Sequence, residues 1–246
     1  MNYESKLKAL VEEAYSLFSS YTIGEKIEAC CGHCMTMEDC ELLLTLPLTQ
    51  IDQRLISNYL NAAETIDQYA VSQQMKYFLP KFLDFLVQGI DLCHSNEIIF
   101  GKCYISHENS WTTEEIEFMQ RFARCYFQMQ LTKFEETESV CQFIIMFYLG
   151  GLDIHPLLDD WAKALDQPMP MLNLIQMLHY EFEDYGYDQA FSDENLIQIM
   201  NQWLKNLRNN ELLINALVDV ISKNDIPPEY QYMYDSAFDQ LQLTNK

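Results

Sequence analysis

The chain has 246 residues, 49% of them hydrophobic, and its 37 Asp and Glu against 15 Lys and Arg give a formal net charge of −22. This charge disfavours direct binding to nucleic-acid phosphates or to an anionic membrane surface, and it would attract a basic protein. Solubility is the alternative explanation of the charge. Only seven glycines occur, which argues against phosphate-binding loops and β-hairpins and favours long helices.

The first residues lead directly into an amphipathic helix, without the pattern of a secretory signal. No apolar run of about 18 residues is free of charges, so no membrane span is expected. These features predict a cytoplasmic protein. Its eight cysteines are then expected to be reduced thiols or metal ligands.

Helical periodicity recurs along the chain, and no sustained alternation typical of strands is present. The expected helices are 3–19, a short one from Thr36 to before Pro47, one capped by Thr49, 66–91, one from Ser95 to about His107, Thr112 to about Leu131, 136–149, 155–165, 169–184, one after Ser192, 209–222 and 227–243. Short links between such helices predict an all-α fold of about ten to twelve helices in antiparallel pairs, bundle-like or solenoid-like. We expect residues 1–246 to form a single domain, with a polar link at 132–139 as the best place for a sub-boundary between 1–131 and 140–246.

The most apolar helix is expected within residues 75–90. Large apolar side chains stand at 75, 78, 79, 82, 83, 86 and 90, which is helical spacing. Pro80 lacks an N–H and clashes with the carbonyl four residues earlier, so we expect a kink or a new helix starting near Pro80. Phe82 lies at the centre of this stripe and is expected in the core.

A capping box is expected where Thr112 precedes Glu115 by three residues. The helix that it opens has a predicted inner face at helical spacing. That face comprises Ile116, Met119, Phe122, Ala123, Tyr126 and Met129.

Cys31 and Cys34 form a CxxC pair, a spacing that lets two thiolates reach one Zn²⁺. His33 or Cys40 could supply a third ligand, which makes Cys31, His33, Cys34 and Cys40 the tentative metal set. A more distant cysteine or histidine would complete it (Cys93, His94 or Cys103). The alternatives are packed free thiols, which are common in protein interiors, and a thioredoxin-like redox pair, for which the surrounding βαβ pattern is absent.

No GxSxG, GxGxxG or GxxxxGK[ST] motif occurs, so the sequence does not predict an enzyme and requires no cofactor. Instead, tyrosines gather among acidic residues in the C-terminal half. Tyr supplies rigid contact area and carboxylates orient Lys or Arg, so these clusters are candidate partner-binding residues. They are Glu181, Glu183, Asp184, Tyr185, Tyr187, Asp188, Tyr230, Tyr232, Tyr234 and Asp235. The alternative is a set of half-buried tyrosines that close helix ends.

Three stretches resemble a family of uncharacterised bacterial cytosolic proteins over roughly residues 1–130. They are Cys31-Gly32-His33-Cys34-Met35-Thr36-Met37-Glu38-Asp39, Leu46-Pro47-Leu48 and Tyr77-Phe78-Leu79-Pro80-Lys81-Phe82-Leu83-Asp84-Phe85-Leu86. The family pattern has a Cys-rich knot followed by Ser-Pro-Glu-Asp, then a Thr-Pro-Leu turn and a Phe-Leu-Pro helix. Here His33 replaces a Cys and Met37 replaces a Pro. The resemblance implies no particular activity for this chain.

The small, acidic, helical character is also similar to that of immunity proteins of interbacterial toxin systems. This likeness implies that the protein binds and neutralises a basic toxin domain, such as a secretion-system or Rhs-type effector. The alternative function is a zinc-binding helical regulator or enzyme built on Cys31 and Cys34.

Overall fold

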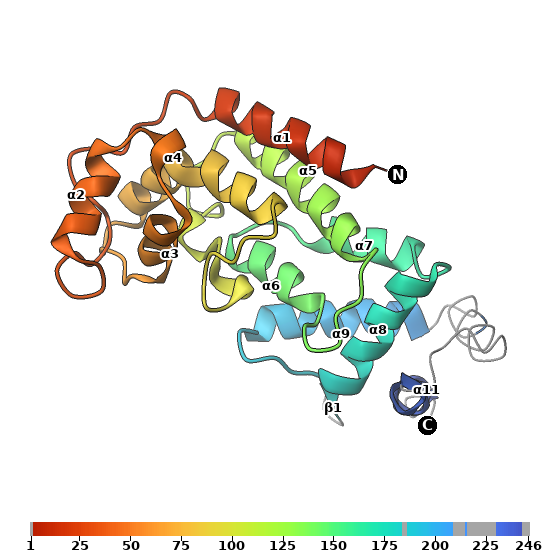
Figure 1. The fold of residues 1–246 in the computed structure, drawn as a ribbon. Coiled ribbons are helices and arrows are strands. Elements are labelled where there is room, and N and C mark those ends of the chain that lie inside the picture. Colours follow the sequence, from red (N-terminus) through yellow and green to blue (C-terminus); the bar gives the residue numbers. More distant parts are fainter. Residues whose placement is uncertain (1, 184–185, 209–214, 216–229, 243–246) are drawn as a thin grey trace. The chain divides into compact units, whose positions relative to one another are not determined.

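The computed structural model describes residues 2–183, 186–208, 215 and 230–242. The regular secondary structure of this part is almost entirely helical, with ten α-helices, three short 3-10 helices and a hairpin of two-residue strands (Figure 1). The prediction of an all-α fold is confirmed. None of the helices described combines the length and hydropathy that crossing a bilayer requires.

The elements follow one another with short links. The α-helices are α1 (Tyr3–Leu17), α2 (Met37–Thr45), α3 (Gln53–Asn61), α4 (Gln68–Val87), α5 (Thr113–Gln130), α6 (Cys141–Leu149), α7 (His155–Lys163), α8 (Pro168–Tyr180), α9 (Glu194–Arg208) and α11 (Gln231–Gln242). The 3-10 helices are η1 (Leu48–Gln50), η2 (Asn96–Ile98) and η3 (Gly101–Cys103). Strands β1 (Phe182–Glu183) and β2 (Gly186–Tyr187) pair antiparallel, with Phe182 opposite Tyr187.

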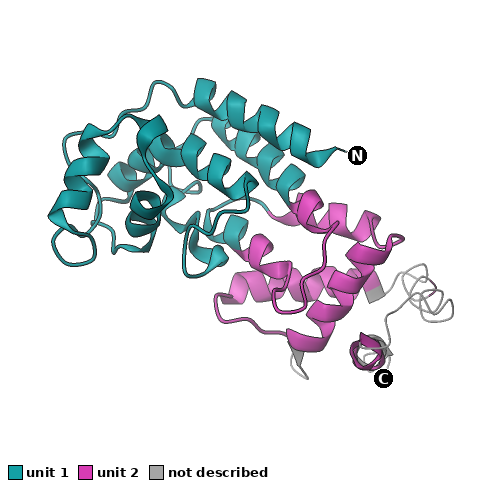
Figure 2. Ribbon diagram, in the orientation of Figure 1, with its two compact units in different colours: residues 1–126, 146–153 teal, residues 127–145, 154–246 magenta. Residues whose placement is uncertain are grey.

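Two compact units divide the chain (Figure 2). Unit 1 contains residues 1–126 and 146–153, and unit 2 contains residues 127–145 and 154–246. The sequence favoured a single domain, with the polar link 132–139 as the best place for a sub-boundary if one exists. The structure instead places the division within α5 and α6 and just before α7, so the chain passes between the units three times.

Helix α4 is the centre of unit 1. Its stripe is buried as predicted, with Phe78, Leu79, Phe82 and Leu83 all at 0% exposure. Phe78 packs against Phe82 with ring centroids 5.8 Å apart. Pro80 lies inside one continuous helix, which Asp67 caps by accepting a hydrogen bond from the Ala70 N–H. No new helix begins at Pro80.

The capping box of α5 is confirmed in both directions. The Thr112 hydroxyl accepts from the Glu115 N–H at 3.3 Å, and the Glu115 carboxylate accepts from the Thr112 N–H at 2.8 Å. The predicted inner face is buried except at Ile116, which is 36% exposed. Ile116 points outward because Glu115 and Phe118 face the interior, and this sets the phase of the first turn.

Several predicted boundaries differ from the structure. Asp52, not Thr49, caps α3, because its carboxylate accepts from the Leu55 N–H at 2.9 Å. The helix expected between Ser95 and about His107 is replaced by η2 and η3, which end where Tyr104 takes a left-handed backbone conformation. Helix α6 begins at Cys141, later than expected. The helix expected over 209–222 and the start expected at 227 lie outside the described residues.

Unit 2 has a core built around two tryptophans. Trp161 of α7 is fully buried and contacts Phe127 and Trp203, with ring centroids 5.9 and 5.1 Å apart. Both indole N–H groups are satisfied, since Trp161 donates to the Pro170 carbonyl at 2.9 Å and Trp203 donates to the Leu158 carbonyl at 3.1 Å. Helix α11 packs on α8 in this unit.

Candidate functional site

The end of α8 and the start of α11 bring two exposed tyrosines together in unit 2. The hydroxyls of Tyr180 and Tyr232 lie 3.0 Å apart, although 52 residues separate them in sequence. Their side chains remain 55% and 48% exposed. The His179 ring meets both edge-on, at 4.5 Å from Tyr180 and 5.2 Å from Tyr232. We call Tyr180, Tyr232, His179 and the neighbouring Tyr230 and Glu136 the tyrosine surface.

The tyrosine surface raises the pKa of one of its own hydroxyls and lies close to carboxylates. The pKa of Tyr232 is raised above its ordinary value, first by the hydrogen bond with Tyr180 and then by partial burial and the fields of Tyr180, Glu136 and Tyr230. Glu136 belongs to an exposed acidic link with Glu135 and Glu138. The surface therefore combines exposed aromatic rings with nearby carboxylates.

Two buried amides of α8 hold this acidic link in place. Gln176 donates to the carbonyls of Glu135 and Glu136 at 2.8 and 3.1 Å. Asn173 donates to the carbonyl of Lys133 at 2.8 Å. Because both amides are almost fully buried, the link is fixed to α8 by interior contacts rather than by its own charges.

The structure brings together only some of the predicted partner-binding residues. Tyr232, Asp235 and Asp188 are exposed, and Tyr230 is half-buried. Glu181, Tyr187 and Tyr234 are 6%, 2% and 3% exposed, so their assignment to a contact surface is corrected: they belong to the interior. Asp184 and Tyr185, together with the side chain of Glu183, lie outside the described residues. Sequence reasoning missed Tyr180, His179 and Glu136, because their pairing with Tyr232 depends on the contact between α8 and α11.

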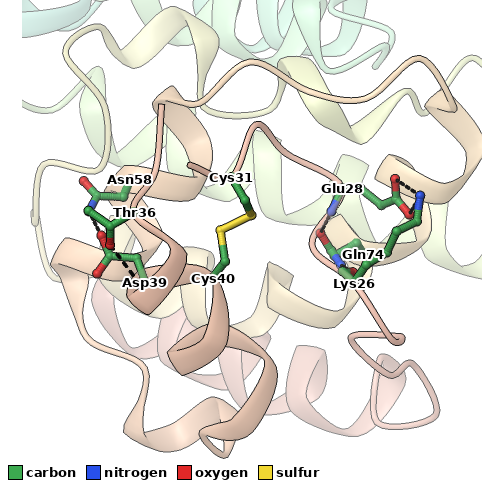
Figure 3. Close-up of a disulfide and its surroundings, with 8 residues drawn as sticks. All are labelled: Lys26, Glu28, Cys31, Thr36, Asp39, Cys40, Asn58 and Gln74. Carbon is green, nitrogen blue, oxygen red and sulfur yellow. Dashed lines mark hydrogen bonds and ion pairs between the residues drawn. A yellow bond between two sulfur atoms is a disulfide. The ribbon is translucent and has the colours of Figure 1, made fainter. Parts of the chain in front are cut away.

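The predicted metal-binding residues lie in a tight loop of unit 1. Cys31 forms a disulfide with Cys40, with Cα atoms 6.3 Å apart (Figure 3). The loop reverses at Gly32, whose φ is +88° and whose N–H donates to the Met35 carbonyl at 2.7 Å. Thr36 caps α2 and so directs Cys40 back toward Cys31. Cys31 is thus bonded to Cys40, not paired with Cys34.

The tentative zinc set of Cys31, His33, Cys34 and Cys40 does not fit this geometry. Disulfide sulfurs provide no thiolates, and His33 and Cys34 are both exposed. Across the described residues, which include all eight cysteines, no group of three or more Cys, His, Asp or Glu could hold a metal ion. The expectation that every cysteine is a reduced thiol or a ligand is likewise corrected for Cys31 and Cys40.

Polar side chains flank the disulfide loop on two sides (Figure 3). On one side Asp39 accepts from Arg54 at 2.6 Å and from Asn58 at 3.0 Å, and the bond from Arg54 is the main reason that the pKa of Asp39 is lowered. On the other side Gln74 accepts from the Glu28 N–H at 2.8 Å and donates to the Lys26 carbonyl at 2.9 Å. These contacts tie the loop to α3 and α4.

Cys30 is a half-buried free thiol directly before the disulfide. The backbone of Cys34, its thiol and the backbone of His33 lower the pKa of Cys30 from its ordinary value, although partial burial acts to raise it. The backbone of Cys30 is fixed, because its N–H donates to the Ala63 carbonyl at 2.7 Å and its carbonyl accepts from the Met35 N–H at 3.1 Å. The main chain at Cys30 is therefore joined both to the residue after α3 and to the far side of the loop.

Comparison with known proteins gives no relative. No protein-family model matches the sequence, and neither a curated protein nor a solved structure matches it. Functional inference therefore rests on the residues of this chain.

Proposed function

We propose that this protein is an acidic binding protein, and most specifically an immunity protein that binds and occludes a basic toxin domain. The observation that carries the proposal is the exposed Tyr180–Tyr232 pair beside the acidic link at Glu135, Glu136 and Glu138. The likeness in character to immunity proteins supports the same function.

The tyrosine surface has the chemistry of an anchoring patch. Tyrosine rings provide large, rigid contact area, and they are enriched among the residues that dominate binding energy. A Lys or Arg of the partner can lie over a tyrosine ring while its charge meets Glu136. Buried contacts of this kind would slow dissociation of the complex.

The negative charge of unit 2 favours a basic partner. Unit 2, residues 127–145 and 154–246, has 18 Asp and Glu against 6 Lys and Arg, or −12 of the total charge of −22. Opposite fields raise the encounter rate of two proteins, and salt screens this effect within about 8 Å at 0.15 M ionic strength. Association with the partner should therefore slow steeply as salt is raised.

The disulfide between Cys31 and Cys40 argues against a zinc-binding regulator or enzyme built on Cys31 and Cys34, because Cys31 then offers no thiolate to a metal. The tyrosine surface is also distinct from that loop, because it lies in unit 2 and the loop lies in unit 1.

The test combines protection of cells with binding kinetics. A candidate toxin domain encoded beside this gene is expressed with the protein, and survival and the association rate are measured. Changing Glu135, Glu136 and Glu138 to Lys should slow association and weaken protection, whereas Tyr180→Ala with Tyr232→Ala should speed dissociation. Glu181 is left unchanged, because it is buried and its substitution would disturb folding.

A matched control makes the same change in net charge on unit 1. Glu4, Glu12 and Glu114 are exposed there, and changing them to Lys should slow association much less. If the two triple variants behave alike, only net charge matters and the tyrosine surface is not the interface. If the wild-type protein binds no basic domain from its own genome and protects no cell, the immunity function is wrong.

A further inference from the structure

We propose that Cys31 and Cys40 form a reversible redox pair, which a small dithiol opens and which closes again on the same two sulfurs while unit 1 keeps its fold. The disulfide loop, residues 31–40, is then a redox-sensitive segment of unit 1. This inference does not rest on the proposed function, because the tyrosine surface belongs to unit 2.

The chain before the disulfide is anchored without the help of either sulfur. The Cys30 N–H donates to the Ala63 carbonyl at 2.7 Å, and the Thr65 N–H donates to the Glu28 carbonyl at 3.2 Å. The buried Gln74 of α4 accepts from the Glu28 N–H at 2.8 Å. These hydrogen bonds fix the start of the disulfide loop to the segment that follows α3.

The other end of the disulfide loop is anchored separately, on α3 itself. Asp39, the residue before Cys40, is 5% exposed and accepts from Arg54 at 2.6 Å and from Asn58 at 3.0 Å. Leu43, one turn further along α2, is fully buried, and α2 packs on α3. Figure 3 shows the disulfide between these two groups of polar contacts. Neither group includes a sulfur atom.

The two anchors keep Cys31 and Cys40 within bonding reach after the disulfide is opened. Their Cα atoms lie 6.3 Å apart, inside the range of about 4.4–6.8 Å in which disulfides form. A free chain would pay loop-closure entropy to bring the two thiols together, whereas here the contacts with α3 have already met most of that cost. The reduced thiols therefore meet at a high effective concentration, which favours closure on the same pair.

The disulfide is also open to attack from one side. Cys31 is half-buried and is followed by three exposed residues, whereas Cys40 is 4% exposed. A small thiol reagent therefore approaches from the side of Cys31.

Dithiothreitol serves as the probe. One of its thiolates attacks the Cys31 sulfur, the bond between the two cysteines breaks, and Cys40 leaves as a thiolate. The second thiolate of the reagent then attacks its own sulfur in the mixed disulfide and expels Cys31. One protein disulfide is reduced to two thiols, the reagent is oxidised to its cyclic disulfide, and the two protons of the reagent pass to Cys31 and Cys40.

The experiment places the full-length protein in buffers of reduced and oxidised dithiothreitol, followed by alkylation, peptide mapping and circular dichroism. Wild-type protein should go from six free thiols to eight as the buffer becomes reducing, with its far-ultraviolet spectrum unchanged. Return to an oxidising buffer should restore six thiols and the Cys31–Cys40 linkage. Cys31→Ser with Cys40→Ser should fold as the reduced wild type does.

Two variants test the anchor on α3. Arg54→Ala should be half reduced at a roughly twofold to fivefold lower ratio of dithiol to cyclic disulfide, because loss of an exposed ion pair weakens the hold on α2. Asn58→Ala should shift the ratio in the same direction. Arg121→Ala is the matched control, since Arg121 is 54% exposed against 56% for Arg54 and pairs with Glu13, and it should behave as wild type.

Four results would overturn the proposal. The first is a disulfide that dithiothreitol opens only when the protein is denatured. The second is loss of helical signal on reduction or in the double serine variant, which would mean that the anchors do not hold the fold. The third is closure of Cys31 on Cys34 or on another cysteine. The fourth is an equal shift for Arg54→Ala and Arg121→Ala, which would remove the role of α3.

Discussion

Lys76 and Glu115 form an ion pair inside unit 1, with Nζ and Oε2 2.7 Å apart and side chains only 2% and 5% exposed. The same carboxylate accepts from the Tyr21 hydroxyl and from the Thr112 N–H. The ammonium also contacts the Trp111 ring, with 4.8 Å between Nζ and the centroid. One charged pair therefore joins α4, the start of α5 and the segment after α1.

The first prediction concerns removal of one partner from this pair. Glu115→Gln should lower the free energy of unfolding by about 3–5 kcal/mol, because it leaves the Lys76 charge buried without its counter-ion. Chemical denaturation measures the loss. Lys76→Met combined with Glu115→Leu should lose less than the sum of the corresponding single changes. Additive losses would show that the two side chains are not energetically coupled.

The second prediction is the pH dependence of the same contribution. Burial alone would raise the pKa of Glu115, but hydrogen bonds from Lys76, Tyr21 and Thr112 outweigh it and lower the pKa from its ordinary value. A lowered pKa in the folded state means that the stabilisation is complete above the unfolded-state pKa and is lost as pH falls through the folded value. The stability difference between wild type and Glu115→Gln should stay constant from neutral pH to about 4.5 and shrink below it. A difference that begins to shrink near neutral pH would contradict the assignment.

The third prediction tests the phase of α4. Phe82→Ala should lower the free energy of unfolding by about 3–5 kcal/mol, because a fully buried ring is lost and a cavity remains. Ile66→Ala is the control, since Ile66 is fully exposed, and it should change stability by less than about 0.5 kcal/mol. A loss below about 1 kcal/mol for Phe82→Ala would place this ring outside the core.

The fourth prediction compares two glycines with similar backbone angles. Gly151 has φ +90°, and a Cβ there would lie 2.8 Å from the Ser106 nitrogen, whereas Gly24 has φ +83° and open space around it. Gly24→Ala should lose about 1–2 kcal/mol from backbone strain alone. Gly151→Ala should lose clearly more, because the clash is with main chain that cannot move aside freely. Equal losses in thermal unfolding would mean that the close approach to Ser106 is absent.

The fifth prediction concerns the tyrosine surface itself. Tyr180→Phe removes the hydrogen bond that contributes most to the raised pKa of Tyr232. The pKa of Tyr232 should therefore fall toward its ordinary value, as followed by NMR of a selectively labelled tyrosine. Tyr15→Phe in unit 1 is the control and should leave it unchanged. An unaltered Tyr232 titration in Tyr180→Phe would show that the two hydroxyls are not in contact.

Sequence periodicity and capping residues were sufficient to predict most helices in this chain. Thr36 and the Thr112–Glu115 box mark helix starts that the structure confirms, because capping is a local interaction. The apolar stripe of α4 also predicted its buried face, because apolar side chains at helical spacing lie on one side of a helix. The stretch around Tyr104 was mispredicted as helix, because its left-handed backbone is set by contacts in the fold and not by local propensity.

The candidate sites could be predicted only in part. The CxxC spacing drew attention to Cys34, but the pairing of Cys31 with Cys40 depends on how Gly32 reverses the loop. Similarly, neighbouring tyrosines in the sequence need not share a surface. Tyr232 and Tyr234 are two residues apart on α11, and only the first is exposed. Contacts between distant helices decide such cases, and a single sequence does not reveal them.

The three passages of the chain between the units limit how this protein can be divided. Residues 146–153 complete unit 1 after the excursion through 127–145, and the Gly150 carbonyl accepts from the Ile105 N–H at 3.1 Å. Phe147 also stacks on Phe100, with ring centroids 5.5 Å apart. No single cut in the gene can therefore separate the two units with both complete, so recombination should pass them on together as one inherited block.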